Sequence, residues 1–192
     1  MNSKIPEFRE KLQKKLNPGR YEHSLSVAFT CICLAMRYGY PIDQAEVAGM
    51  LHDCAKGYDN DTIIRHCEKK GIEITEDERK APAVLHAKYG AWLAENTYDI
   101  LDQEILDAIA CHTTGKPAMG LLDKILYVAD YIEPRRDKAP NLKEIRKLAF
   151  MDLDLALLKI LEDTLGYLGD SPEEVDSMTR ETYEYYKAQI KG

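Results

Sequence analysis

Apolar residues recur at intervals of three and four positions along almost the whole chain of 192 residues, and runs that alternate apolar and polar residues are missing. This spacing places apolar side chains on one face of a helix, whereas strands need a spacing of two. Glycine and proline stand at the breaks, where helices normally end or begin. The sequence therefore predicts an all-α fold. We expect helices at residues 4–16, 20–38, 43–55, 61–70, 84–96, 102–112, 120–133, 141–150, 152–168 and 173–190.

The expected helices are joined by short connections. Only residues 133–141, which are rich in charge and contain two prolines, have the character of a longer loop, and no internal repeat is visible. Hydrophobic residues make up 45% of the chain, enough for a sizeable core. Because domains usually contain about 100–200 residues, we expect one domain.

Composition excludes several classes of partner. The longest nearly apolar run, at 27–36, is well short of the ~18–20 residues that cross a membrane. The first residues lack the apolar segment of a secretory signal, so we expect a cytoplasmic protein that does not bind membranes. A formal net charge of −7 disfavours nucleic acid as a partner. The five cysteines, without CxxC spacing, fit a reducing compartment, and we interpret them as core residues.

Polar residues interrupt several apolar helix faces. Four of the five histidines lie on such faces, whereas His66 lies beside charged residues and is expected to be solvated. Asp53 follows His52 directly, and Asp130 lies within the apolar segment 125–132. A single inward histidine is more often a hydrogen-bonded core residue than a metal ligand, but so many together favour one buried polar site. Its expected members are His23, His52, Asp53, His86, His112 and Asp130.

Four imidazoles and two carboxylates form a ligand set for Fe, Mn, Ni, Zn or Co rather than for Ca or Mg. A single catalytic ion must leave one coordination position open for a water, and six protein ligands are more than such an ion needs. We therefore expect two ions. Asp53 has two oxygens and would bridge the ions. Adjacent helical residues diverge by about 100°, so His52 and Asp53 converge only near a helix end, which Gly57 would supply. Lys56, about one turn beyond Asp53, would place an ammonium beside a bound phosphate.

The order His23, His52-Asp53, Asp130 resembles the H…HD…D signature of the HD-domain metal-dependent phosphohydrolases. Four strings are similar to the bacterial YqeK-type family of HD hydrolases: RYEHSLSV (20–27), LHDCAK (51–56), HTTG (112–115) and ADYIEPRR (129–136). The resemblance spans residues 20 to about 165. It implies a single HD-type helical domain over residues 1–192, with an HD core at about 20–135 and C-terminal helices at about 141–190 packed on it. It also implies symmetrical hydrolysis of diadenosine tetraphosphate to two ADP.

The resemblance further implies roles for individual residues. His23, His52, Asp53 and Asp130 would hold the first ion, and His86, His112 and the bridging Asp53 the second. Iron is the expected metal, with Mn, Co, Ni and Zn as alternatives. Catalytic roles would fall to Asp53 and Lys56. Contacts to substrate phosphates would fall to Arg20, Lys56, Thr113 and Arg135.

A water bridging two divalent ions loses a proton near neutral pH, so the expected nucleophile is a hydroxide held between the ions. Two alternatives stay open: a phosphohydrolase of another nucleotide, and a non-catalytic helical sensor that binds metal or nucleotide. The expected partner is a dinucleoside polyphosphate or another nucleotide, and a homodimer is left open. We expect three tyrosines of the last helix, Tyr183, Tyr185 and Tyr186, to cover the core.

Overall fold

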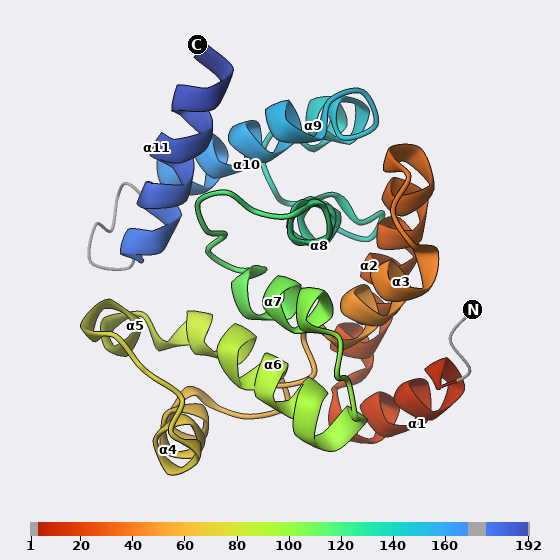
Figure 1. Cartoon of the computed structure of the whole chain (residues 1–192), viewed down its shortest axis with the longest axis vertical. Helices are drawn as coiled ribbons and strands as arrows, with labels where there is room; N and C mark the ends of the chain where they lie inside the picture. The colour runs from red at the N-terminus through yellow and green to blue at the C-terminus, as the bar shows by residue number, and fades with distance from the viewer. Residues whose placement is uncertain (1–3, 169–175, 192) are drawn as a thin grey trace.

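The computed structural model describes residues 4–168 and 176–191, and this part of the chain is all-α, as the sequence predicts (Figure 1). It contains eleven α-helices and one 3₁₀ helix. In chain order these are α1 (Ile5–Lys15), α2 (Pro18–Tyr38), α3 (Ile42–Leu51), α4 (Asn60–Lys70), α5 (Glu76–Lys80), η1 (Pro82–Val84), α6 (Leu85–Tyr98), α7 (Gln103–Cys111), α8 (Leu121–Ile132), α9 (Leu142–Leu148), α10 (Leu153–Leu168) and α11 (Ser177–Lys191). Residues 173–175 of the last expected helix lie outside the described residues.

Helix α8 lies at the centre of the molecule, with α2, α3, α7 and α10 packed around it (Figure 1). Its sequence, LLDKILYVADYI, is apolar on nearly every side, as expected for a helix with neighbours all round. Ile125, Leu126, Val128 and Ala129 are completely buried. A polar residue on this helix, such as Asp130, is therefore held close to several other helices.

Helices α2 and α3 pack closely because a glycine lies between them. A Cβ atom added to Gly49 would lie 2.7 Å from the Cα atom of Ala28, a distance that real Cβ atoms do not tolerate. At the end of α2, Gly39 has a φ of 72° and terminates the helix in the left-handed conformation. These two glycines fix how the chain passes from His23 on α2 to the residues that follow α3.

The last two helices cover one side of α8, since α10 contacts both α8 and α11. Tyr186 is buried, and its hydroxyl accepts a hydrogen bond of 2.8 Å from the backbone N–H of Met119. Tyr183 and Tyr185 are half-buried against the same core. The three tyrosines therefore cover the core, as expected.

The structure corrects four local expectations. Helix α3 ends at Leu51 rather than near residue 55, and Gly57 does not end it. Gly57 is instead needed for space, because a Cβ there would lie 2.8 Å from the carbonyl oxygen of Lys15. His66 is half-buried and hydrogen-bonded to the hydroxyl of Tyr89, so it is not simply solvated. Four of the cysteines are buried, but Cys33 is exposed.

Two short elements, α5 and η1, were not expected from the sequence. Helix α5 has five residues, too few to show a helical repeat, and it starts with a capping box between Thr75 and Glu78. None of the helices in residues 4–168 and 176–191 is long and apolar enough to cross a membrane.

Candidate metal centre

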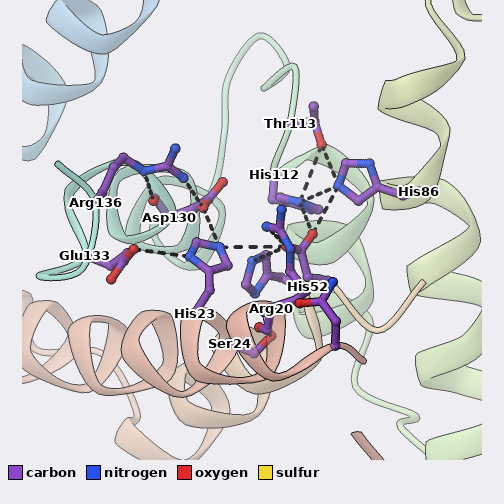
Figure 2. A network of polar contacts seen from close by, with 12 residues as sticks. Arg20, His23, Ser24, His52, His86, His112, Thr113, Asp130, Glu133 and Arg136 are labelled. Carbon is purple, nitrogen blue, oxygen red and sulfur yellow. Dashed lines mark hydrogen bonds and ion pairs between the residues drawn. The ribbon is translucent and has the colours of Figure 1, made fainter. Parts of the chain in front are cut away.

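The six residues of the expected buried site come together at one point, although they are spread over more than 100 positions of the sequence. Figure 2 shows the imidazoles of His23, His52, His86 and His112 turned toward a common centre. Helices α2, α6 and α8 contribute residues from their length, whereas the turns after α3 and α7 contribute the rest. His52 and His112 each come directly after the last residue of a helix, α3 and α7 respectively.

The carboxylate of Asp53 lies in the middle of the cluster. Its Oδ2 atom is 3.4 Å from Nε2 of His52 and 3.7 Å from Nε2 of His23. Its Oδ1 atom is 3.2 Å from Nε2 of His86 and 3.7 Å from Nε2 of His112. On the His23 side, Oδ1 of Asp130 completes the group at 3.0 Å from Nε2. The two oxygens of Asp53 therefore face two separate pairs of imidazoles.

All the histidines of the cluster except His23 are oriented by a hydrogen bond from Nδ1, the ring nitrogen that faces away from Asp53, to the backbone. Nδ1 of His52 donates to the carbonyl of Gly49 at 2.7 Å. The same bond, to the carbonyl three residues earlier, measures 2.6 Å at His86 and 2.8 Å at His112. When Nδ1 carries the proton, Nε2 has a free lone pair. The backbone thus leaves Nε2 of these three rings as the atom that could bind a cation.

His23 is oriented by a carboxylate instead. Oε1 of the buried Glu133 lies 3.3 Å from Nδ1 of His23. Glu133 is not among the site residues expected from the sequence. The sequence feature that could have pointed to Glu133 is its position, three residues after Asp130 at the end of an apolar helix. Asp130 is itself held by Arg136, whose Nη2 lies 2.8 Å from Oδ1.

The cluster has unsatisfied atoms where a cation would bind. Nε2 of His23 and Nε2 of His52 are buried, and neither makes a well-directed hydrogen bond within the part of the chain that the structure describes. Burial of an unpaired polar atom is costly, so such atoms normally have a ligand. Two groups of three residues each have ligand atoms that all lie within 4.8 Å of one another. The first group is His23, His52 and Asp130, and the second is His52, Asp53 and His112. These residues fit a divalent metal ion.

The electrostatics of Asp53 and His86 favour the protonation states that bind metal. Burial on its own would raise the pKa of Asp53, but the charge of His52 and the hydrogen bonds of His112 and His86 hold this pKa well below its usual value. Burial lowers the pKa of His86 to about 4, against the opposing effect of Asp53. At neutral pH the carboxylate is therefore ionised and this imidazole is neutral, as metal ligands must be.

Three of the four expected substrate contacts lie at the cluster. Nη1 of Arg20 is 2.7 Å from Oδ2 of Asp53. Oγ1 of Thr113 is 3.5 Å and 3.4 Å from the Nε2 atoms of His86 and His112. Lys56 is half-buried, burial lowers its pKa, and it makes no ion pair with any described residue.

Arg135 is not brought to the cluster. Its guanidinium lies 3.5 Å from the carboxylate of Glu22, and its side chain is 57% exposed. The neighbouring Arg136 reaches Asp130 instead. Arg136 also lines a hollow of about 360 Å³ together with Asn17, Gly19, Arg20, His23 and Glu133. The open side of the cluster is here, because the side chains of His23 and Asp130 are 12% and 26% exposed whereas that of Asp53 is 3% exposed.

The HD domain family matches residues 20–135, and the chain is therefore an HD-domain protein. Over 176 residues it is 38% identical to the protein of Bacillus subtilis strain 168 named bis(5'-nucleosyl)-tetraphosphatase, symmetrical. The alignment covers 91% of this chain and 92% of that protein. A protein of the same name from Staphylococcus aureus is 34% identical, and the alignment covers 95% of this chain and 94% of that protein. Within the HD-domain proteins, the chain belongs to the family of these symmetrical tetraphosphatases.

A solved structure supports the fold. The crystal structure of a protein from Clostridium acetobutylicum, described as a predicted HD superfamily hydrolase involved in NAD metabolism, superimposes with a TM-score of 0.92. It is 36% identical and covers 96% of this chain and 97% of that one. The expectation of a single-domain, all-α HD fold is confirmed.

Proposed function

We propose that this protein is a metal-dependent hydrolase that cleaves diadenosine tetraphosphate symmetrically to two ADP. Relatives that match nearly the whole chain carry the name of this activity. The observation that carries the proposal is the position of Asp53, whose two oxygens face separate pairs of imidazoles. This is the arrangement expected of a carboxylate that bridges two ions.

The proposal assigns His23, His52, Asp53 and Asp130 to one ion, and His86, His112 and Asp53 to the other. Mixed imidazole and carboxylate ligands suit iron, with Mn, Co, Ni and Zn as alternatives. When bound, the ions would supply an activated water and neutralise negative charge on the phosphates. A cytoplasmic location and a homodimer remain predictions from the sequence.

Other residues of the chain would bind and orient the polyphosphate. Arg20 and Arg136 line the hollow on the open side of the cluster, and guanidinium groups bind phosphate through paired donors. Lys56 lies within electrostatic range of Asp53 and has no ion-pair partner among the described residues, so its ammonium is free for the substrate. Thr113 would donate its hydroxyl hydrogen beside the His86–His112 pair. Arg135, which pairs with Glu22, is left out of this set.

The proposal is tested by anaerobic purification, metal analysis and product analysis with diadenosine tetraphosphate. We expect bound transition metal and ADP as the sole nucleotide product. Products of AMP and ATP would contradict symmetrical cleavage. Equal turnover of unrelated nucleotides would contradict the substrate assignment, and a metal-loaded protein that cleaves no phosphate bond would favour a sensor.

A further inference from the structure

Arg146, a half-buried residue of α9, bonds three carbonyl oxygens at the end of α8 and in the turn that follows it. Its Nε atom donates to the carbonyl of Ile132 at 2.8 Å. Its Nη2 atom donates to the carbonyls of Glu133 and Arg136, at 2.7 Å and 2.8 Å. The last carbonyls of a helix have no partner within the helix, and a cation is favoured beside them. One guanidinium therefore satisfies the groups that α8 and its turn leave open.

The turn that Arg146 bonds carries two side chains that orient the candidate metal centre. Oε1 of Glu133 lies 3.3 Å from Nδ1 of His23, and Nη2 of Arg136 lies 2.8 Å from Oδ1 of Asp130. Figure 2 shows both side chains at the His23 end of the cluster. A shift of this turn would therefore move the groups that hold these two expected ligands.

The turn is also bonded within itself. The backbone N–H of Arg135 donates to Oε2 of Glu133 at 2.7 Å, and the backbone N–H of Arg136 donates to the carbonyl of Glu133 at 3.1 Å. These bonds set the shape of the turn but do not attach it to another helix. Arg146 supplies that attachment, and it makes no ion pair with any described residue that would draw its guanidinium elsewhere.

We propose that Arg146 is a positioning residue for one half of the metal centre. It holds the turn at 133–136 in the conformation in which Glu133 and Arg136 face their partners, and its own bonds go to main-chain carbonyls rather than to a ligand atom. The inference rests on the metal centre of the proposed function. It also makes that centre depend on α9, which lies beyond the residues 20–135 that match the HD domain family.

The other half of the metal centre does not depend on this turn. Nδ1 of His86 donates to the carbonyl of Ala83, and Nδ1 of His112 donates to the carbonyl of Ile109. Both rings are thus oriented by their own segments of chain. Loss of Arg146 should weaken one ion site and spare the other, whereas a general loss of stability would weaken both.

Arg146→Met tests the inference, because it keeps an apolar stem and removes every donor. Competition with a chelating dye, under anaerobic conditions, measures the two metal affinities of wild type and variant. We expect one affinity to fall by about tenfold or more, as for loss of other residues that orient metal ligands, and the second to stay within error. Lys147→Met removes a positive charge from the next, exposed position of α9 and should leave both affinities unchanged. Two unchanged affinities in Arg146→Met, or an equal fall in both, would overturn the inference.

A conservative variant extends the test. Arg146→Lys keeps a cation with three N–H donors, but one ammonium does not reproduce the fork of the guanidinium. We expect an intermediate fall of about three- to tenfold, confined to the same ion, as for loss of one hydrogen bond. This variant decides the question if Arg146→Met does not fold, since two unchanged affinities or an equal fall in both would again overturn the inference.

The outcomes separate the inference from the proposed function. If the wild type binds two ions but cleaves no dinucleotide, the proposed function is wrong, and a selective fall in Arg146→Met still supports the positioning role. If the wild type cleaves the dinucleotide and Arg146→Met binds both ions equally well, only the positioning role is wrong. If the wild type binds no metal, both are wrong.

Discussion

At the scale of single residues, Asp53 places the strictest demand on its neighbours, because its carboxylate is buried. Its side chain is 3% exposed, and four imidazoles and the guanidinium of Arg20 lie around it. An ionised carboxylate at such a position needs positive charge close by, because burial without it costs several kcal/mol. Arg20 supplies part of that charge, and divalent ions would supply the rest.

Asp53→Ala should remove both bound metal and activity. We expect turnover of the dinucleotide to fall by at least ~1,000-fold, because the bridging ligand is lost. The helical circular dichroism should stay close to that of the wild type, since Asp53 lies in a turn after α3. Asp137→Ala, on the exposed loop after α8, is the control. Normal turnover by Asp53→Ala would refute the bridging role.

Glu133→Gln should weaken metal binding without removing a ligand. Glu133 orients His23 and increases the basicity of its imidazole, and loss of such a partner lowers metal affinity by ~10–100-fold. Competition with a chelating dye measures the affinity. Glu22→Gln alters an exposed carboxylate next to His23 and should bind metal normally. Equal affinities in the two variants would show that Glu133 has no such influence.

The sequence could predict the six members of the cluster because each one interrupts an apolar face or segment. Glu133 could not be found in this way, since it lies at a helix end where acidic and basic residues are common. Arg135 was the arginine expected at the site, but Arg136 beside it carries the same side chain. Only the turn after α8 decides which of them faces Asp130, so the choice needed coordinates.

At the scale of helices, the close contact of α2 with α3 keeps His23 near the His52-Asp53 turn. The contact depends on Gly49, which has no side chain to separate the two helices. The helical repeat predicted both helices, but it could not predict how closely they approach, because that distance depends on which small residues face each other. The five-residue helix α5 was likewise too short for a repeat to reveal.

Gly49→Ala should destabilise the protein although alanine is the better helix former. The added Cβ would lie 2.7 Å from the backbone of Ala28, and overpacking of this kind costs about 1–3 kcal/mol. At Gly166 in α10, no atom of the described residues lies within 4 Å of the new Cβ, so Gly166→Ala should stabilise the helix by up to about 1 kcal/mol. Urea unfolding measures both. A stabilised Gly49→Ala variant would contradict the packing described for α2 and α3.

At the scale of the whole molecule, the candidate metal centre links helices from both halves of the sequence. Ligands from α2, α6 and α8 and from two turns meet at one point, so bound ions would cross-link the core. Ions that bind the folded chain alone stabilise it in proportion to the logarithm of their concentration. The net charge of −7 does not oppose this binding, because cations are attracted to an acidic protein.

Metal removal should therefore lower the melting temperature of the protein. Metal at about 100 times its dissociation constant contributes ~2.7 kcal/mol, which corresponds to roughly 5–10 °C for a chain of this size. Calorimetry before and after dialysis against a chelator measures the change. Asp53→Ala should show almost no shift. A wild-type melting temperature that is insensitive to metal would mean that ions do not cross-link the core.

If Asp53 bridges two ions, each of its two oxygens belongs to a separate metal site. The most direct measurement is the metal content per chain of the anaerobically purified wild type and of His112→Ala, determined by elemental analysis. We expect about two ions in the wild type and about one in His112→Ala, because that variant loses a ligand of one site only. One ion or none in the wild type, or the same content in both proteins, would contradict it.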